Sequence, residues 1–511
     1  MRQINPLMKM DYPDPDVIRV EDTYYLVSTT MHFFPGGSLL KSYNLVDWEI
    51  AGYLFDTLDD TRGERLVREH VNYGGGMWAP CIRYHEGKFY VIFGSHTGEG
   101  CTHLYIADSI EGPWEHRVFK EYYHDCSLLF DDDGRVYLTY GNRDIHLQEM
   151  NADLSGPKED GLSRVIIRDS ADIKLGYEGS HFQKIGGHYY VFLVHWEKDA
   201  CRTESVYRAD NLEGEFIGRD VLAHDRGYYG QGVAQGGVVD TPDGKWYGVL
   251  FQDSGAVGRI PVLVPVTWED GWPVFGSNGI VNDDFELPKV SRAHTYEPLF
   301  TSDFSDDYSA KPIKMAKQWQ WNHRPNNDLW YLSQEGKLTI GTDKLSINVT
   351  HAKNTLTQRL LFPGCVITVT VDASELNDGD FAGICALQSL YGTLAVSKEA
   401  GRFYLNEIVR DGIAQGWTSQ TGDCLPGKFL ERVALDGPVV RLRMIAEFSR
   451  LKDTIHFQYE NEKGRFVKVG TPHKIAFMLD HFAGNRVGLF VYSTREIGGK
   501  VTFSDFSYLP G

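Results

Sequence analysis

Three carboxylates occupy places where they could do acid–base chemistry: Asp14, Asp125 and Glu178. Asp14 lies between two prolines, in the segment Tyr12-Pro13-Asp14-Pro15-Asp16. A proline fixes its own φ and restricts the residue before it, so we predict that Asp14 is held on a stiff, extended backbone. Such a mount suits a carboxylate that must meet a reacting atom at a set distance and angle. Taken alone, the motif is more typical of a strand entrance with a solvated aspartate. The choice between this structural role and a catalytic role for Asp14 depends on the rest of the chain.

A hairpin pattern occurs five times in the first half of the chain: an apolar strand, a tight turn, and a strand that opens with aromatic residues. The last tyrosines of the copies are Tyr25, Tyr90, Tyr137, Tyr190 and Tyr247, at intervals of 65, 47, 53 and 57 residues. Four of the turns contain Glu-Gly, Asp-Gly or Gly-Gly, which supply the positive φ that short hairpins need. The interval suits a four-stranded antiparallel blade with a variable loop, so we predict a five-bladed β-propeller over residues 1–295. We expect the N-terminal segment to pair into the last blade and close the ring.

The same register places five side chains at one point. The innermost strand of each blade runs along the propeller axis, so matching positions in successive blades converge there. Twelve residues before the last tyrosine of four copies stand Trp78, Asp125, Glu178 and Gln235, and the shorter first copy aligns Asp14 with them. A purely structural position would favour one shared residue type. Three carboxylates, a tryptophan and an amide indicate a functional site instead.

Glycoside hydrolysis is a reaction that needs two carboxylates in different protonation states. A third carboxylate can raise the pKa of the acid by like-charge repulsion, or hold it in position. Trp78 would add an apolar wall against a sugar face. Clustered acids can also bind calcium, and Asp131-Asp132-Asp133-Gly134 looks superficially like a calcium loop. That segment falls on a hairpin turn and lacks the later ligands, so we interpret it as turn chemistry.

An ordered set of motifs in blade register resembles glycoside hydrolase family 43. The motifs are Asn5-Pro6, Tyr12-Pro13-Asp14-Pro15, Phe33-Phe34-Pro35-Gly36, Met77-Trp78-Ala79-Pro80, Asp125 through Phe130, Tyr177-Glu178-Gly179-Ser180-His181, and Gly258-Arg259 before Val264-Pro265-Val266-Thr267-Trp268. The resemblance implies that Asp14 is the general base, that Glu178 is the general acid, and that Asp125 tunes the pKa of the acid and orients it. It also implies inversion of anomeric configuration, with the two carboxyl groups typically about 6.5–9.5 Å apart.

The resemblance implies further roles around these carboxylates. Arg259 matches an arginine that binds sugar hydroxyls, and Phe33, Phe34 and Trp78 would line the pocket for the −1 sugar. Core packing is the alternative role for either phenylalanine. Many relatives have a histidine near a hydrated calcium ion where this chain has Gln235, which we place among the substrate-facing residues. A structural calcium near Gln235 therefore stays open, and the acid–base chemistry requires no cofactor.

Residues 296–511 are predicted to form a second, antiparallel β-sandwich domain of jelly-roll type. Alternating segments such as residues 366–371 and 439–444 carry this prediction. The region resembles the concanavalin-like C-terminal domain of β-xylosidases in the same family. Trp319 and Trp321 alternate onto one face, which we expect to be the domain interface or the core. We expect the loop 480–485, with Phe482, to reach over the propeller mouth, and a closed pocket would restrict the enzyme to chain ends.

Composition limits the partners. A net charge of −19 disfavours nucleic acid and anionic membranes. No signal-peptide core and no uninterrupted apolar span are present. The seven cysteines are an odd number without CxxC spacing, so we expect reduced thiols and a cytoplasmic protein. A small oligosaccharide is the expected substrate, and a homo-oligomer stays open.

The sequence thus predicts an exo-acting, inverting glycosidase that releases β-D-xylose, α-L-arabinofuranose or both from hemicellulose-derived oligosaccharides. The choice between the two sugars is left open. One alternative is a non-catalytic carbohydrate-binding propeller protein. The other is a retaining fructosidase of similar architecture, which would need an Asn-Asp-Pro-Asn-like motif that Pro13-Asp14-Pro15-Asp16 lacks.

Overall fold

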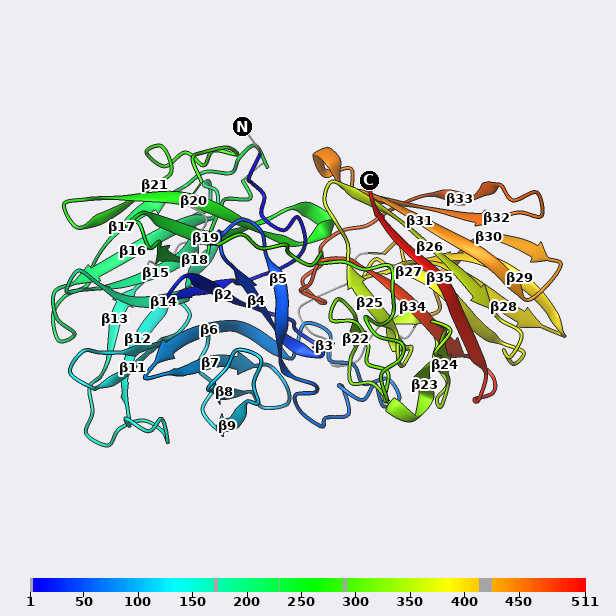
Figure 1. The fold of residues 1–511 in the computed structure, drawn as a ribbon, viewed down its shortest axis with the longest axis horizontal. Helices are drawn as coiled ribbons and strands as arrows, with labels where there is room; N and C mark the ends of the chain where they lie inside the picture. The colour runs from blue at the N-terminus through cyan, green and yellow to red at the C-terminus, as the bar shows by residue number, and fades with distance from the viewer. Residues whose placement is uncertain (1–2, 170–172, 229, 288–291, 413–424) are drawn as a thin grey trace.

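The computed structural model describes residues 3–169, 173–228, 230–287, 292–412 and 425–511. Within them the regular structure consists of β-strands and four short 3₁₀ turns. The strands form a five-bladed propeller and, beside it, a two-sheet sandwich (Figure 1). The all-β fold predicted from the sequence is confirmed.

Each of the five blades is a four-stranded antiparallel sheet whose strands follow one another in chain order. Blade 1 contains β1 (Asp16–Val20), β2 (Thr23–Ser28), β4 (Gly36–Ser42) and β5 (Glu49–Phe55). Blade 2 contains β6 (Met77–His85), β7 (Lys88–Ser95), β8 (Cys101–Ala107) and β9 (Glu115–Phe119). Blade 3 contains β10 (Ser127–Phe130), β11 (Val136–Tyr140), β12 (Asp144–Met150) and β13 (Ser163–Arg168). Blade 4 contains β14 (Leu175–Ile185), β15 (His188–Trp196), β16 (Thr203–Ala209) and β17 (Ile217–Leu222). Blade 5 contains β18 (Gly236–Asp240), β19 (Trp246–Asp253), β20 (Arg259–Glu269) and β21 (Trp272–Phe275).

The five hairpin copies are the first two strands of the five blades. Their last tyrosines pair in register with Ile18, Arg83, Leu129, Gln183 and Val239 of the preceding strands. Because the inner strands share this register, the residues at or just before their starts meet at the axis. The repeat therefore predicted both the fold and the point of convergence.

The N-terminal segment joins the first blade to the last. The side chain of Asn5 donates to the carbonyl of Leu263 at 2.8 Å and accepts from its N–H at 2.9 Å. Farther along, the N–H of Tyr12 donates to the carbonyl of Arg259 at 3.0 Å. These contacts run along β20, so the predicted closure of the ring is confirmed.

Two antiparallel sheets form the sandwich. One sheet has the order β3 (Phe33–Phe34), β22 (Gln320–Asn322), β25 (Leu356–Arg359), β34 (Arg486–Ser493), β27 (Asp380–Leu387), β28 (Gly392–Glu399), β29 (Arg402–Val409) and β30 (Lys428–Leu435). The other has the order β23 (Trp330–Leu332), β24 (Leu338–Gly341), β35 (Lys500–Pro510), β26 (Gly364–Asp372), β31 (Val439–Glu447), β32 (Thr454–Glu460) and β33 (Phe466–Lys474). The 3₁₀ turns are η1 (Gly255–Val257), η2 (Asn327–Leu329), η3 (Val349–His351) and η4 (Ser449–Leu451).

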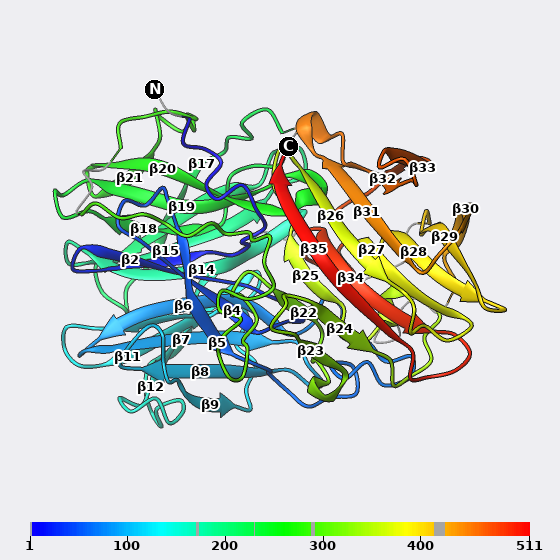
Figure 2. The ribbon, with the colours of Figure 1, turned by 45° about the vertical axis from the view of Figure 1, so that its right-hand side comes forward.

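The two domains lie side by side in both ribbon views and share an interface (Figure 2). Strand β3 comes from the propeller part of the chain but pairs with β22 of the sandwich. Arg359 donates from Nε to the carbonyl of Asp11 at 2.7 Å and from Nη2 to Ser38 Oγ at 3.1 Å. Trp319 and Trp321 are buried in a hydrophobic cluster that spans both domains. The prediction that these tryptophans belong to the core is confirmed.

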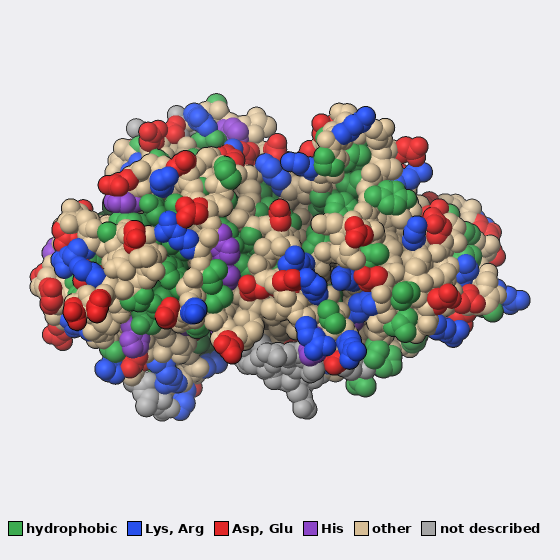
Figure 3. Space-filling view, turned by 90° about the horizontal axis from the view of Figure 1, so that it is seen from below, with side chains coloured by type: hydrophobic (Ala, Val, Ile, Leu, Met, Phe, Trp, Pro, Cys, Tyr) green, Lys and Arg blue, Asp and Glu red, His purple; other side chains and the backbone are tan. Residues whose placement is uncertain are grey.

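Charged side chains and thiols occur in both domains of the described chain. Acidic and basic side chains are interspersed over the face drawn in Figure 3. Six cysteines are free thiols, and Cys424 lies outside the described residues. In the described part of the chain, no helix has the length and apolarity needed to cross a membrane.

Candidate active site

The five residues aligned by the hairpin repeat line one cavity on the propeller axis. The cavity wall consists of Asp14, Trp78, Ala79, Asp125, Leu175, Glu178, Val194, Arg202, Gln235, Phe251, Arg259 and Phe482. Every blade contributes at least one residue, and Phe482 comes from the sandwich. The structure therefore brings together all three carboxylates, both predicted polar partners and the predicted loop residue.

Asp14 is held from two sides. The carbonyl of Pro13 accepts hydrogen bonds from Ser28 Oγ at 2.7 Å and from the N–H of Thr29 at 3.2 Å. Arg259 Nη1 donates to Asp14 Oδ1 at 3.0 Å. The predicted extended backbone is wrong, because Asp14 has a φ of +50° in the left-handed region. A non-glycine residue persists there only when its surroundings determine it, so the mount is rigid through contacts as well as prolines.

Arg259 belongs to a buried ion cluster with Asp253 and Arg202. Its Nε donates to Asp253 Oδ1 at 3.2 Å, and Arg202 Nη2 lies 2.9 Å from Asp253 Oδ2. Burial acts to raise the pKa of Asp253, but the two guanidinium charges outweigh it and lower that pKa. Among the residues that the structure describes, the buried Nε and Nη1 of Arg202 have no hydrogen-bond partner. Since Arg202 lines the cavity, these unused donors could bind a ligand hydroxyl.

Glu178 is held on β14, where the pairing with β15 is interrupted by irregularities on both sides of the residue. Its Oε2 lies 3.3 Å from His124 Nε2 and also accepts a hydrogen bond from Asn142 Nδ2. The next residue, Gly179, donates its N–H to Asp125 Oδ2 at 3.0 Å. Asp125 thus contacts the backbone that carries Glu178, a geometry suited to orienting the acid. Asp125 also has a positive φ, +44°.

The charges in this group bias its protonation. Burial raises the pKa of Asp125 to about 6, with Glu178 and Asp14 adding to the effect and His124 opposing it. Burial also acts to raise the pKa of Glu178, but the hydrogen bond and charge of His124, with Arg202 and Arg259, lower it overall. His124 responds inversely: burial acts to lower its pKa, and the carboxylates outweigh this and raise it to about 9. A raised pKa of the acid is one of the two effects expected of a third carboxylate. In the resting site the imidazole beside Glu178 outweighs that effect and stabilises the carboxylate.

Trp78 and Phe482 form the aromatic part of the cavity. Their rings stack with centroids 5.2 Å apart and planes inclined by 19°. The guanidinium of Arg259 lies 4.4 Å from the Phe482 ring centroid. The sandwich loop that carries Phe482 is fixed to the propeller, because the N–H of Gly484 donates to Asp11 Oδ2 at 2.8 Å and Asn485 Nδ2 donates to the carbonyl of Ala256 at 2.9 Å.

Two of the predicted pocket residues lie elsewhere. Phe33 and Phe34 form β3 and do not line the axial cavity. Phe33 is buried in a hydrophobic cluster shared with the sandwich, and Phe34 is buried in a cluster inside the propeller. Their role in the structure is the packing alternative considered above. The reason is the pairing of β3 with β22, a contact between distant parts of the chain.

The side chain of Gln235 offers one amide oxygen as a ligand for calcium. Its side chain lies against Gly179, where an added Cβ would come within 2.3 Å of Gln235 Cδ. Among the described residues, the one close group of three His, Cys, Asp or Glu donors is His124, Asp125 and Glu178, and one of its three donors is an imidazole. Calcium prefers six to eight oxygen ligands, and the donor set at Gln235 does not fit that preference. No chemical step is assigned to a metal here.

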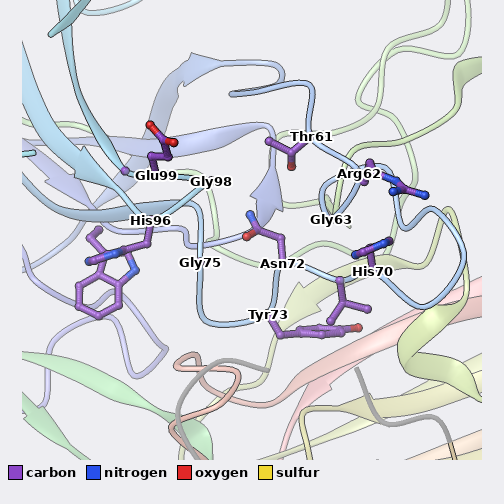
Figure 4. A pocket seen from close by; sticks show the side chains of 13 residues that line it. Thr61, Arg62, Gly63, His70, Asn72, Tyr73, Gly75, His96, Gly98 and Glu99 are labelled. Atoms are coloured by element: carbon purple, nitrogen blue, oxygen red, sulfur yellow. The ribbon is translucent and has the colours of Figure 1, made fainter. Parts of the chain in front are cut away.

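A second, larger cavity of about 650 Å³ adjoins the first and shares Trp78 with it. Loops after β5 and β7 line this cavity, with His96 and Glu99 on one side and Arg62 and His70 on the other (Figure 4). His96 packs against Trp78 at a centroid distance of 4.2 Å. A ligand seated on the axis could therefore extend past Trp78 into this space.

Comparison with known proteins agrees with this architecture. Residues 4–273 match the family described as glycosyl hydrolases family 43, and residues 305–509 match the β-xylosidase C-terminal concanavalin A-like domain. These matches show that a propeller with three axial carboxylates, whose cavity is completed by a sandwich loop, is the architecture of a glycoside hydrolase. The chain belongs to glycosyl hydrolase family 43.

Individual relatives cover most of the chain. It is 25% identical to a β-xylosidase of Formosa agariphila over 99% of this chain and 90% of that protein. It is 30% identical to a putative β-xylosidase of Xylanibacter ruminicola over 83% of this chain and 80% of that protein. The structure of a bifunctional GH43-CE protein of Bacteroides eggerthii superposes with a TM-score of 0.90 at 38% identity. That match covers 99% of this chain, which spans only 63% of the length of the Bacteroides eggerthii chain.

Sequence reasoning missed His124, Arg202 and Asn142. His124 directly precedes an axial aspartate, and this adjacency was the one available signal. Arg202 and Asn142 lie just before the third strands of blades 4 and 3, outside the register of the inner strands. Nothing in the hairpin repeat marks those positions.

Proposed function

We propose that the protein is an exo-acting, inverting glycoside hydrolase that releases β-D-xylose, α-L-arabinofuranose or both from hemicellulose-derived oligosaccharides. One observation carries the proposal: Asp14, fixed by Arg259, and Glu178, fixed by His124 and Asn142, line the same axial cavity. The names of relatives support the substrate class. Besides the β-xylosidase already mentioned, a non-reducing-end α-L-arabinofuranosidase of Bacteroides ovatus is 27% identical over 65% of this chain and 63% of that protein.

In the proposed reaction, Glu178 gives its proton to the leaving oxygen as the bond from that oxygen to the anomeric carbon breaks. A water molecule attacks the anomeric carbon from the opposite face, and Asp14 accepts a proton from this water. Asp125 holds the backbone of Glu178 through Gly179. Arg259, Arg202 and Gln235 are proposed to bind sugar hydroxyls. The site needs no cofactor for these steps.

Phe482 is proposed to make the enzyme act on chain ends. Its ring lies on Trp78 and Arg259 in the axial cavity, and its loop is hydrogen-bonded to the propeller. A polysaccharide could not pass through a cavity walled in this way. A terminal sugar could enter from the larger cavity on the other side of Trp78.

The proposal is tested with one chromogenic substrate for each sugar. The 4-nitrophenyl β-D-xylopyranoside and α-L-arabinofuranoside are assayed side by side with the parent protein and with Glu178→Gln. Turnover of at least one glycoside by the parent and its loss in the variant, with ligand binding retained, is expected. A parent without turnover that still binds xylo-oligosaccharides would favour a carbohydrate-binding protein instead.

A further inference from the structure

His124 stands at the centre of the polar contacts around Glu178, but the steps above do not use it. Its Nε2 lies 3.3 Å from Glu178 Oε2 and 3.6 Å from Asp125 Oδ2. Its Nδ1 lies 3.0 Å from the hydroxyl of Tyr122. Both ring nitrogens therefore have partners, and these partners fix the orientation of the imidazole.

The contacts continue outward from His124. The hydroxyl of Tyr122 lies 2.5 Å from His96 Nε2, and His96 lines the larger cavity. A continuous chain of hydrogen-bonding groups thus leads from Glu178 through His124 and Tyr122 to a cavity where a leaving group could stand. The hydroxyl of Tyr122 contacts the imidazoles of both His124 and His96 and so orients them relative to each other.

We propose that His124 is a positioning residue for the acid step: it and Glu178 share one proton, which His124 holds in the resting site and Glu178 delivers to the leaving oxygen. This inference rests on the proposed role of Glu178 as general acid. It adds that the proton needed for bond cleavage is kept in the site as an imidazolium–carboxylate pair.

Each catalytic cycle consumes one water molecule, and the site gains and loses no proton overall. Transfer of the Nε2 proton from His124 to Glu178 turns an imidazolium and a carboxylate into a neutral imidazole and a carboxylic acid, so the charge of the pair does not change. Glu178 then gives this proton to the leaving oxygen, and Asp14 takes one from the attacking water. After product release the pair regains one proton from solvent and Asp14 gives one up, which leaves net hydrolysis.

The charges around the pair favour this arrangement. His124 faces three carboxylates, those of Asp125, Glu178 and Asp14, which raise its pKa to about 9 against the effect of burial. Glu178 also faces the guanidinium groups of Arg202 and Arg259. His96 and Tyr122 are the other ionisable groups described beside His124. Burial together with the charge of His124 lowers the pKa of His96 to about 4, and burial raises the pKa of Tyr122, so both stay neutral.

Substrate binding supplies the reason for the proton to move. An ion pair loses much of its stabilisation by water when a sugar fills the cavity, and the neutral form of the pair loses less. The alkaline limit of activity then belongs to the pair as a whole. Without the imidazole, Glu178 alone must keep the proton, and the limit moves to lower pH.

The test compares the pH dependence of kcat/KM in the parent and in His124→Gln. A glutamine can place an amide N–H near the position of the imidazole Nε2, so it can keep a hydrogen bond to Glu178 but cannot carry the proton. We expect the alkaline limb of His124→Gln to move at least one pH unit lower on a 4-nitrophenyl glycoside, so that the loss of kcat/KM is larger at pH 8 than at pH 5.5. An unchanged limb, or a uniform loss at every pH, would overturn the inference.

Two comparisons keep the result unambiguous. His188→Gln is the matched control, because His188 pairs with Asp210 at 2.7 Å outside the axial cavity, and its limb should follow the parent. Thermal melting checks that His124→Gln is folded. His124→Asn is a second substitution without a titrating ring, and we expect the same shift of its alkaline limb. A parent-like limb in a folded His124→Asn would also overturn the inference.

A third comparison separates failure of this inference from failure of the proposed acid. A 2,4-dinitrophenyl glycoside needs little protonation of its leaving group, so Glu178→Gln should retain far more activity on it than on the 4-nitrophenyl glycoside. An equal loss on both would refute the acid role of Glu178 and the inference with it. A selective loss in Glu178→Gln with an unshifted limb in His124→Gln would refute the inference alone.

Discussion

Acidification should weaken the closure of the active site through a buried histidine at the domain interface. His481 lies in the loop that carries Phe482, and its ring stacks on Tyr73 at a centroid distance of 3.7 Å with planes only 4° apart. His32 and His323 lie in the same aromatic group and are fully buried. The loop that completes the cavity is therefore anchored on neutral imidazoles.

The magnitude follows from the pKa of His481, which burial lowers from 6.5 to about 4. A histidine whose pKa is lower in the folded than in the unfolded state resists protonation on folding. The free energy of unfolding therefore has its full value above the unfolded pKa of about 6.5 and decreases as the pH falls from there toward 4. At pH 5 the loss amounts to about 2 kcal/mol, since one pKa unit corresponds to about 1.4 kcal/mol. With an unfolding entropy of roughly 2 cal/mol/K per residue, this lowers the melting temperature by about 2 °C.

The assay compares thermal melting of the parent and of His481→Phe at pH 7.5 and pH 5. Phenylalanine keeps a ring against Tyr73 but cannot be protonated. We expect the decrease in melting temperature between the two pH values to be about 2 °C smaller in the variant. An equal decrease in both proteins would refute the idea that the buried imidazole penalises acidification.

Two further substitutions and one deletion probe the axial cavity and its closure. Arg259→Lys should lower kcat/KM roughly 10- to 150-fold, because it removes a charged hydrogen bond to Asp14 of about 1.5–3 kcal/mol; a change below threefold would contradict the role of Arg259. Phe482→Ala should raise KM at least tenfold with a smaller effect on kcat, because it removes the ring stacked on Trp78; Leu479→Ala, at a half-exposed position before the same loop, is its control and should behave like the parent. Deletion of the chain after residue 300 should abolish turnover, because β3 loses its partner β22 and the cavity loses Phe482; full activity in the isolated propeller would contradict the role of the sandwich.

The fold could be predicted because one local pattern repeats. The hairpin of residues 128–137, for example, contains its own strand, turn and register, so five copies define five blades without any long-range information. The same register identified Gln235 and Trp78 as neighbours of the three carboxylates. Equivalent positions in a sequence repeat occupy equivalent positions in the fold wherever each repeat forms the same local structure.

Contacts between repeats and between domains could not be predicted in this way. The pairing of β3 with β22 places Phe34 opposite Trp321, and no local pattern announces that partner. The conformation of Asp14 depends on the hydrogen bond from Thr29 to the carbonyl of Pro13 and on the contact of Asp14 with Arg259, which the flanking prolines do not reveal. His124 was missed for the same reason, because its function depends on Glu178, a residue from the next blade.

The central claim is that Asp14 and Glu178 act on opposite faces of the anomeric carbon, one through water and the other on the leaving oxygen. Proton NMR of the sugar released from a β-D-xyloside during the first minutes, before mutarotation, tests it most directly. The account predicts that α-D-xylose forms first and that the β-anomer follows only as the two equilibrate. First formation of β-D-xylose would show retention and contradict the assignment of Asp14 as a base that activates water.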